Sequence, residues 1–354
     1  MKTKANLPFS EKFSSFKYLE DILCKDENLA GTMADVLNAP LSKSTIKSYE
    51  YVWRDFSSFC IKHFYSIENI SEQSVIHFLF KLEHNKVGAA YFQKVIPAIR
   101  LRCKLTGRTV ESLESPYLNT VIQGCKRLAV KRKAEVKKAK AFPLTVLKCL
   151  VGRYIAPFLL DSASIDAEAF RSIFRAIIQY FTFCRFDCFS KLQARHFSIK
   201  GESIEVYFPS AKNDQFHQGK TTFLMPNNTV FCPVQLTKLY FIRFGLNMGE
   251  KTDLSFVNFR LKKCGKNSIP VLSESVSYNT AVKCTRSLLT KNGFNAKDIS
   301  EKSAKMEGVT QSLKAGATVE ELMWLGRWRT QSIPYHYKVN SEKFKQSLAS
   351  KVPF

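Results

Sequence analysis

The chain has 354 residues, enough for two ordinary domains, and its content of 45% hydrophobic and 13% aromatic residues allows each domain to bury a core. Its formal net charge of +24 is unusual for an enzyme that acts on small neutral molecules, so no small-molecule substrate is expected. The charge favours a polyanionic partner instead, with nucleic acid first. No stretch approaches the roughly 18 apolar residues of a membrane span, and the N-terminus lacks the apolar segment of a secretion signal. We therefore expect a soluble, intracellular protein without a membrane partner.

The ten cysteines are scattered from Cys24 to Cys284, without C-x-x-C pairs or a Cys/His cluster of zinc-finger form. Cys184 and Cys188 lie one helical turn apart but have no second pair of ligands. They are interpreted as buried apolar residues. The pattern indicates neither a metal nor a cofactor.

The N-terminal part divides into a weakly patterned, polar extension, 1–36, and a helical unit, 37–125. The first strong helix of this unit has Ser42 or Ser44 as its N-cap. Its apolar residues recur at three- and four-residue spacing and are expected to pack inward: Ile46, Tyr49, Trp53, Phe56 and Cys60. Three cations fall on a different face and are candidates for contact with phosphate: Lys43, Lys47 and Arg54.

Further helical patterns cover 72–83 and 88–103, and another helix begins at Ser115-Pro116, an N-cap followed by proline in the first turn. The residues of this last helix that are expected to face inward are Tyr117, Leu118, Val121, Ile122, Cys125 and Leu128. The pattern therefore predicts a compact all-helical unit.

The segment 126–142 is the strongest domain boundary, because residues 126–141 hold eight Lys/Arg and one Glu. It predicts a basic interdomain linker. The linker is either a solvated charge run or a segment that follows a DNA backbone, and KRLAVKRK is also compatible with a nuclear signal if the host is a eukaryote. The cations proposed to contact DNA here are Lys126, Arg127, Lys131, Arg132 and Lys133.

The remaining segment, 143–354, predicts a mainly helical domain that is interrupted by a small β-hairpin. An amphipathic helix carries Phe170, Ile173, Phe174, Ile177, Ile178 and Phe181 on one face. After Gly201 the apolar period changes to two, and 221–225 is typical of a returning strand. Helical patterning resumes over 233–246, 276–291 and 301–346.

Three segments of this domain, together with TIKSYEYVWRDFSSFC (45–60), resemble the tyrosine recombinases of the phage-integrase superfamily. FTFCRFDCFSKLQARHFSI (181–199) resembles the family's first box, with Arg185 in the place of its catalytic arginine. VYFPSAKNDQFHQGKTTFLM (206–225) resembles its hairpin, in the form seen in eukaryotic mobile-element recombinases, and Lys212 takes the place of the hairpin lysine. LKAGATVEELMWLGRWRTQSIPYHY (313–337) resembles the last box, with Trp328 and Tyr337 nine residues apart.

The resemblance implies a helical core-binding domain, a catalytic domain and a DNA cleavage that needs no metal. Tyr337 would attack a DNA phosphodiester to form a 3′-phosphotyrosyl bond, with Arg185 on the phosphate. Lys212 would protonate the leaving 5′-oxygen, and Trp328 would donate its indole N–H to the phosphate while packing against the tyrosine helix. It also implies double-stranded DNA as partner and a homo-oligomer, a tetramer, on two DNA sites.

The chain departs from the family at the second box, H-x-x-R, which falls here on Lys302 and Lys305. Both are cations, and the i, i+3 spacing is expected to present them on one helix face. Lysine offers a point charge where arginine offers a planar fork, and a lysine of ordinary pKa does not accept a proton at neutral pH as histidine does. Desolvation beside other cations would depress the pKa of such a lysine and make it a base.

Three interpretations are compatible with these residues. The first is an active recombinase, supported by the Arg, Lys, Trp and Tyr series. The second is a DNA-binding module derived from a mobile element that has lost the chemistry, supported by the two lysines of the second box. The third, a basic helical RNA-binding or scaffold protein, does not explain the β-hairpin between Arg185 and Trp328.

Overall fold

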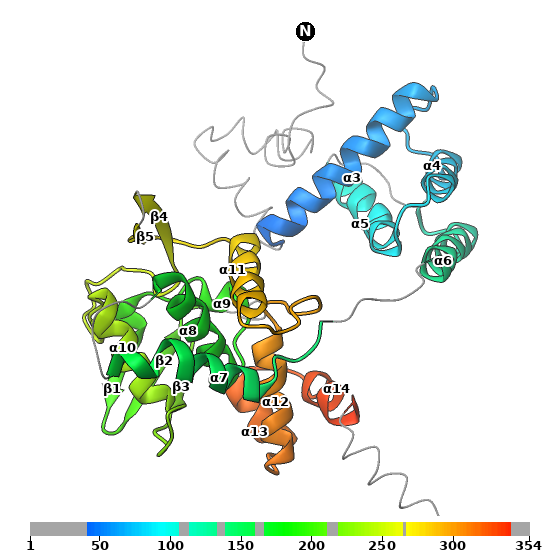
Figure 1. Ribbon diagram of the computed structural model, residues 1–354. Coiled ribbons are helices and arrows are strands. Elements are labelled where there is room, and N and C mark those ends of the chain that lie inside the picture. Colours follow the sequence, from blue (N-terminus) through cyan, green and yellow to red (C-terminus); the bar gives the residue numbers. More distant parts are fainter. Residues whose placement is uncertain are drawn as a thin grey trace, which may run out of the picture. The chain divides into compact units, whose positions relative to one another are not determined.

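The computed structural model describes residues 41–105, 113–132, 139–159, 166–210, 219–264 and 267–340. The chain divides into two compact units, Met1–Val136 and Lys137–Phe354. Figure 1 shows the described elements of each unit. The N-terminal extension expected over 1–36 lies outside the described residues. No helix within the described ranges is long and apolar enough to cross a membrane.

The described part of the first unit is helical. Its helices are α3 (Lys43–Lys62), α4 (Glu72–His84), α5 (Ala89–Leu105) and α6 (Pro116–Lys131). Helix α3 packs on α5, and α4 and α5 both pack on α6. Their shared core contains Trp53, Phe56 and Cys60, which the three- and four-residue spacing places on the inner face of α3.

The helix starts in this unit follow the capping residues of the sequence. Ser42 is the N-cap of α3, and its Oγ accepts a hydrogen bond from the Thr45 N–H at 3.2 Å. Ser115 caps α6 in the same way, ahead of a proline in the first turn. The expectation that Tyr117 and Leu128 face inward is wrong: 62% and 49% of their surfaces are exposed. The neighbours of α6 cover one face only, which carries Leu118, Ile122 and Cys125.

The basic segment 126–142 begins inside a helix, because α6 continues to Lys131 and buries Ala129. Arg132 follows as the C-cap of α6, and its Nη2 lies 3.1 Å from a carboxylate oxygen of Glu83. The next described residues start at 139, so Lys133 lies outside the described ranges.

The second unit is mainly helical with two small sheets. Its helices are α7 (Leu144–Tyr154), α8 (Ala167–Thr182), α9 (Phe186–Phe189), α10 (Pro233–Phe244), α11 (Tyr278–Lys291), α12 (Ser303–Lys314), α13 (Val319–Gly326) and α14 (Ser332–Asn340), with short 3-10 turns at Ala156–Leu159 and Ala194–His196. Its strands are β1 (Phe197–Lys200), β2 (Ser203–Phe208), β3 (Lys220–Leu224), β4 (Phe259–Cys264) and β5 (Asn267–Ser275).

The hairpin expected after Gly201 is present, and it is extended by a third strand. β2 pairs antiparallel with β3, and β1 pairs antiparallel with the other edge of β2. Ile204, Val206 and Phe208 alternate with less buried residues, so one face of β2 belongs to the core. The predicted period of two is therefore confirmed.

A second hairpin, β4–β5, was not expected from the sequence. Phe259 is buried at its base, whereas most of β4 beyond Phe259 is exposed, so the strand has no apolar alternation that would reveal it. In Figure 1 this hairpin extends away from the helices of the second unit.

Helix α8 lies at the centre of the second unit, in contact with α7, α10, α11 and α12. Its apolar face enters the core as predicted, and the ring of Phe174 stacks on Tyr240 with centroids 3.8 Å apart. Two of its arginines, Arg171 and Arg175, are also buried, so the helix is enclosed on nearly all sides. The helix ends at Phe183, which has a left-handed backbone with φ of +51°.

Helix α12 approaches α8 closely where Gly308 meets Tyr180. A Cβ at Gly308 would lie 2.0 Å from the carbonyl oxygen of Tyr180, so only glycine permits this contact. The close contact brings the first turns of α12, with Lys305, to the end of α8. Arg185 lies three residues after the last residue of α8, Thr182.

Candidate active site

Three aromatic rings form the apolar base of the site. Trp328 is buried, and its ring lies nearly parallel to Phe183 and to Tyr337, with centroids 6.1 Å and 6.3 Å away. Trp328 and Phe183 belong to a small apolar cluster against which Tyr337 packs. The predicted proximity of Trp328 and Tyr337 is therefore present in the structure.

Helix α13 positions Trp328 in this apolar cluster. The helix begins with a capping box in which Thr318 and Glu321 bond each other's backbone N–H groups. It ends at Arg327, whose left-handed backbone, with φ of +55°, turns the chain so that Trp328 points inward. A residue other than glycine rarely adopts this conformation, so the turn is held by its surroundings.

Lys305 lies against the same indole ring. Its Nζ is 4.7 Å from the centroid of Trp328, and only 4% of the residue is exposed. Burial lowers the pKa of Lys305 to about 8, and the neighbouring charges of Arg185 and Arg327 lower it as well. A lysine in this state is partly neutral near physiological pH.

Two guanidinium groups complete a cluster of cations. Arg185 is partly buried just beyond the end of α8, and Arg327 is buried. In the described part of the chain none of Arg185, Lys305 and Arg327 forms an ion pair with a carboxylate. We call these three residues the cation cluster. A buried cluster of this kind attracts an anion, because burying cations without a counter-charge is costly.

The buried thiol of Cys184 does not neutralise the cluster. Burial raises the pKa of the Cys184 thiol to about 12, so Cys184 is neutral at physiological pH. Cys188 is also buried, as expected for an apolar residue, and Asp187 is exposed. Within the described ranges no group of three or more His, Cys, Asp or Glu residues is arranged to hold a metal ion.

Tyr337 is half-buried on α14, and two opposing effects act on its phenol. Burial raises the pKa of Tyr337, and the charge of Arg185 lowers it. The indole Nε1 of Trp328 is buried with no hydrogen-bond partner among the described residues. The phenol of Tyr337, an N–H donor without a partner and the cation cluster thus meet at one place.

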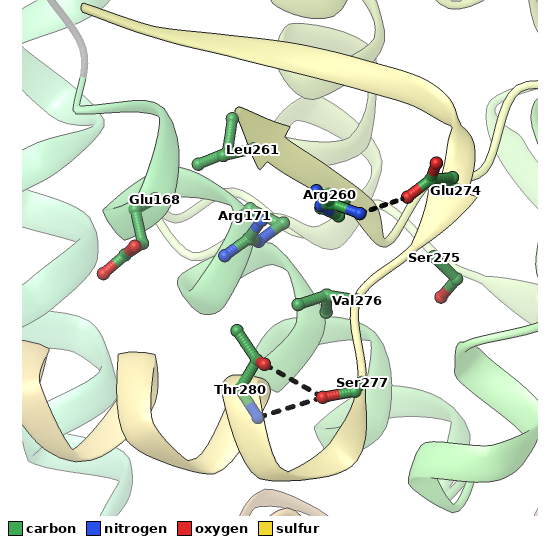
Figure 2. A pocket seen from close by; sticks show the side chains of 9 residues that line it. All are labelled: Glu168, Arg171, Arg260, Leu261, Glu274, Ser275, Val276, Ser277 and Thr280. Atoms are coloured by element: carbon green, nitrogen blue, oxygen red, sulfur yellow. Dashed lines mark hydrogen bonds and ion pairs between the residues drawn. The ribbon is translucent and has the colours of Figure 1, made fainter. Parts of the chain in front are cut away.

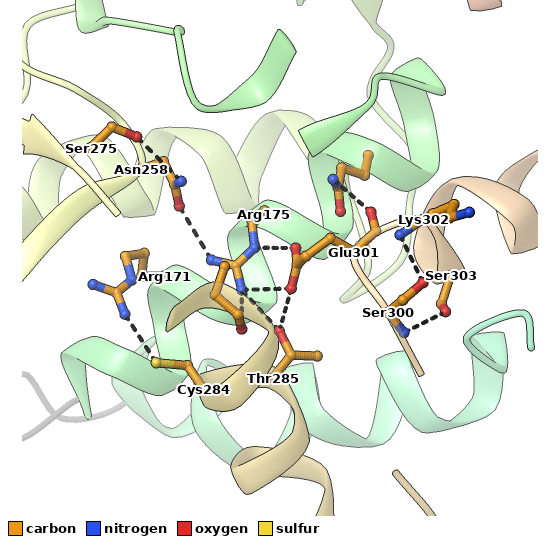
Figure 3. A network of polar contacts seen from close by, with 12 residues as sticks. Arg171, Arg175, Asn258, Ser275, Cys284, Thr285, Ser300, Glu301, Lys302 and Ser303 are labelled. Carbon is orange, nitrogen blue, oxygen red and sulfur yellow. Dashed lines mark hydrogen bonds and ion pairs between the residues drawn. The ribbon is translucent and has the colours of Figure 1, made fainter. Parts of the chain in front are cut away.

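Lys302 and Lys305 do not share an environment, although the i, i+3 spacing suggested one helix face. Lys302 is exposed at the N-cap of α12, whereas Lys305 is buried one turn later. Figure 3 shows the Lys302 side chain directed away from the polar network beside it. Lys302 stands at the exposed N-cap, whereas Lys305 lies within the first turn, where it packs on Trp328. Lys212 lies outside the described residues.

A buried network, which the sequence did not reveal, holds the start of α12 against α8. Arg175 forms an ion pair with Glu301, with Nε 2.7 Å from Oε2, and both side chains are almost fully buried. Asn258 and Thr285 complete the network around the Arg175 guanidinium, as Figure 3 shows. Gln179 donates to the Glu301 carbonyl at 3.0 Å. The sequence signal for it is the presence of two arginines, Arg171 and Arg175, on a helix rich in apolar residues.

Arg327 is the second residue that sequence reasoning missed. Its position directly before Trp328 was a usable signal, since no other arginine lies between Arg286 and Trp328. In the folded chain Arg327 lies beside Arg185 and Lys305. Burial lowers the pKa of Arg327, and the charge of Arg185 lowers it further.

The cations expected to contact DNA in the first unit vary in exposure. Lys47 and Arg54 are exposed on α3, seven residues apart and hence on one face, and Arg54 lies over the ring of Tyr51 at 5.1 Å. On α6, Arg127 and Lys131 are exposed and Lys126 is partly buried, while Arg132 is bound to Glu83. The side chain of Lys43 lies outside what the structure describes.

A pocket of about 450 Å³ lies between α8, the β4–β5 hairpin and α11, and no residue of the cation cluster lines it (Figure 2). Arg260 pairs with Glu274 at 2.7 Å, and Arg171 donates to the Phe259 carbonyl at 2.8 Å. The two arginines and two glutamates of its wall balance each other. None of the predicted site residues lines it, so we assign it no function. The lining residues are Glu168, Arg171, Arg260, Leu261, Glu274, Ser275, Val276, Ser277 and Thr280.

No protein-family model matches the sequence. No curated protein is significantly similar to it in sequence. Solved structures are similar in fold over almost the whole chain. XerH site-specific recombinase in a post-cleavage complex with its difH substrate has a TM-score of 0.56 at 13% identity, covering 98% of this chain and 95% of that one.

Two further structures give the same result. The XerH pre-cleavage complex has a TM-score of 0.55 at 14% identity, covering 98% of this chain and 97% of that one. The Tn1549 transposon integrase, in complex with circular intermediate DNA, has a TM-score of 0.54 at 8% identity, covering 97% and 99%. At such low identity the likeness is one of fold. The chain thus has the mainly α-helical fold of the tyrosine recombinases, with its small antiparallel sheets.

Proposed function

We propose that this protein cleaves and rejoins double-stranded DNA through a covalent 3′-phosphotyrosyl intermediate, with Tyr337 as the nucleophile. The observation that carries the proposal is the meeting of Tyr337 with the cation cluster on the ring of Trp328. A DNA phosphodiester is an anion of the right kind for three cations without a carboxylate partner. The solved structures similar to this chain include XerH site-specific recombinase bound to its difH substrate before and after cleavage.

In the proposed reaction the Oη of Tyr337 forms a bond to phosphorus while the bond to the 5′-oxygen breaks. The phenol proton passes to the neutral form of Lys305, which a pKa of about 8 makes accessible. Lys305 thereby becomes positive as negative charge develops on the phosphate. Arg185 and the free N–H of Trp328 stabilise that charge.

The leaving 5′-oxygen receives its proton from Lys212 in this proposal. Rejoining reverses each step, with a 5′-hydroxyl attacking the phosphotyrosyl bond, so the phosphoester energy is conserved. Exposed Lys302 contacts the DNA backbone rather than the reacting phosphate. The exposed cations of α3 and α6 hold the duplex, and the protein acts as a tetramer on two DNA sites.

The depressed pKa of Lys305 bears on the choice between an active enzyme and a DNA-binding module without chemistry. A lysine of ordinary pKa would have favoured the inactive module, since it could not take up the phenol proton at neutral pH. A buried lysine beside two guanidiniums can do so. This favours activity.

The test is capture of the covalent intermediate. DNA duplexes that bind the full chain are first selected from a randomised pool. Each selected duplex is then synthesised with a 5′-bridging phosphorothiolate at one position at a time. The sulfur leaves without protonation, and the released thiol does not attack the phosphotyrosyl bond, so the covalent intermediate accumulates. We expect an SDS-resistant protein–DNA adduct from the wild type and none from Tyr337→Phe, with duplex affinity unchanged.

Tyr335→Phe is the matched control, because Tyr335 lies on the same helix, two residues earlier, and is 46% exposed. It should form the adduct at the wild-type rate. Loss of the adduct in Tyr335→Phe but not in Tyr337→Phe would identify Tyr335, and not Tyr337, as the nucleophile. Tight, salt-dependent duplex binding with no adduct at any position would establish the inactive module instead.

A further inference from the structure

The second box leaves the site one guanidinium short, because Lys305 stands where the resemblance places an arginine. An ammonium neutralises charge as a point, whereas a guanidinium is a planar fork with five N–H donors. The cation cluster nevertheless contains two guanidiniums, since Arg327 enters it from the end of α13.

Arg327 joins the two chain turns that carry the other site residues. Its Nη2 donates to the carbonyl of Thr182 at 3.0 Å, in the last turn of α8, and its Nη1 lies 3.3 Å from the carbonyl of Leu325. Its guanidinium also lies 4.0 Å from the ring centroid of Phe208 on β2. The residue therefore ties the turn before Trp328 to the turn before Arg185.

Hydrogen bonding alone does not account for an arginine at this position. A neutral amide could donate to the Thr182 carbonyl, and burying a guanidinium without a carboxylate is unfavourable. The positive charge adds to the repulsion that Lys305 already experiences from Arg185. A charge that is costly in the free protein gains a partner when a phosphate enters the cluster.

We propose that Arg327 is a positioning residue that replaces the missing second arginine: it clamps the Trp328 turn to the end of α8 and supplies the second fixed guanidinium charge next to Lys305. The inference rests on the proposed function. It assigns Arg327 two separable tasks, one of hydrogen bonding and one of charge.

Three variants separate these tasks. Arg327→Met removes both, Arg327→Gln keeps an amide donor without charge, and Arg327→Lys keeps the charge without the fork. Two quantities are measured for each. The first is the rate of adduct formation on the phosphorothiolate duplex between pH 6 and pH 10. The second is the titration midpoint of Lys305 by NMR of protein labelled with ¹³Cε-lysine, assigned with Lys305→Arg.

In the wild type we expect the adduct rate to rise with pH and to level off near pH 8, where Lys305 loses its proton. Arg327→Met should lower the plateau rate roughly 100-fold, because a fixed positive charge near the developing negative charge is lost. Both Arg327→Met and Arg327→Gln should move the Lys305 midpoint up by about one pH unit, because a neighbouring like charge is gone. Arg327→Lys should keep the midpoint and lose roughly 10-fold in rate.

A solely structural role for Arg327 would slow the reaction in all three variants without moving the midpoint, and this result would overturn the inference. Wild-type rates in Arg327→Met would also overturn it. If Arg327→Met does not fold, the comparison of Arg327→Gln with Arg327→Lys decides whether the charge of residue 327 sets the titration midpoint of Lys305. Absence of adduct from the wild type would instead count against the proposed function, and the NMR midpoints would still test the charge of Arg327.

Discussion

Replacing the buried Lys305 by methionine should stabilise the protein while abolishing its proposed activity. Burial and two neighbouring cations lower the pKa of Lys305 from its ordinary value of 10.5 to about 8. At about 1.4 kcal/mol per pKa unit, the protonated lysine therefore costs about 3 kcal/mol of folding free energy at neutral pH. The contact with the Trp328 ring returns about 1 kcal/mol of this. Methionine fills a similar volume without charge, so Lys305→Met should gain roughly 2 kcal/mol.

The gain must depend on pH in a defined way. Well below pH 8 Lys305 is protonated in the folded and the unfolded chain, and its full cost is present. Between pH 8 and pH 10.5 the unfolded chain holds the proton and the folded chain does not, so the wild type becomes more stable as pH rises. The advantage of Lys305→Met should therefore be largest at pH 7 and should nearly vanish by pH 10.5.

Urea unfolding of the full chain, followed by tryptophan fluorescence at several pH values, measures this difference. Lys302→Met is the matched control, because Lys302 is exposed three residues earlier, and its effect should stay within about 0.5 kcal/mol. A loss of several kcal/mol in Lys305→Met at pH 7, or a gain that does not change with pH, would show that Lys305 is charged and compensated in the folded protein.

Three more predictions concern the network, the hairpin lysine and the DNA-binding face. Arg175→Met should lower the free energy of unfolding by about 3–5 kcal/mol, because Glu301 is left buried without a partner, and the double variant Arg175→Met/Glu301→Met should recover most of that loss. Arg260→Met breaks an exposed pair and should cost under about 1 kcal/mol in the same urea titration. Lys212→Ala should slow adduct formation on an ordinary phosphodiester but not on the phosphorothiolate, and an equal defect on both substrates would remove Lys212 from the role of general acid. Lys47→Ala and Arg54→Ala should each reduce, by about 0.9, the slope of the logarithm of the duplex association constant against the logarithm of the salt concentration. An unchanged slope would show that this face of α3 does not contact the DNA backbone.

Local sequence signals were sufficient for most elements of the fold. Ser115 marked the start of α6, and Ser42 and Ser44 narrowed the start of α3 to two candidates, because capping depends on residues within one turn. The alternation along β2 predicted its buried face. The β4–β5 hairpin gave no such signal, because β4 is buried at Phe259 and largely exposed beyond it, so no apolar period marks the strand.

The residue types of the candidate site and their order along the chain, with Trp328 and Tyr337 nine residues apart, follow from the amino-acid sequence. The environments of these residues depend on which segments meet in the folded chain. The close contact of α12 with α8 at Gly308 and the Arg175–Glu301 ion pair join segments more than 100 residues apart. No local pattern reports such contacts.

This difference is clearest for the two lysines of the second box. By sequence Lys302 and Lys305 are equivalent cations one turn apart. In the folded chain Lys302 is solvated at the helix start, whereas Lys305 is buried against Trp328 beside two guanidiniums. A pKa depends on desolvation and on neighbouring charges, and both are set by which segments meet in space. The chemistry open to Lys305 is therefore a property of the tertiary structure, and Arg327 becomes part of the site for the same reason.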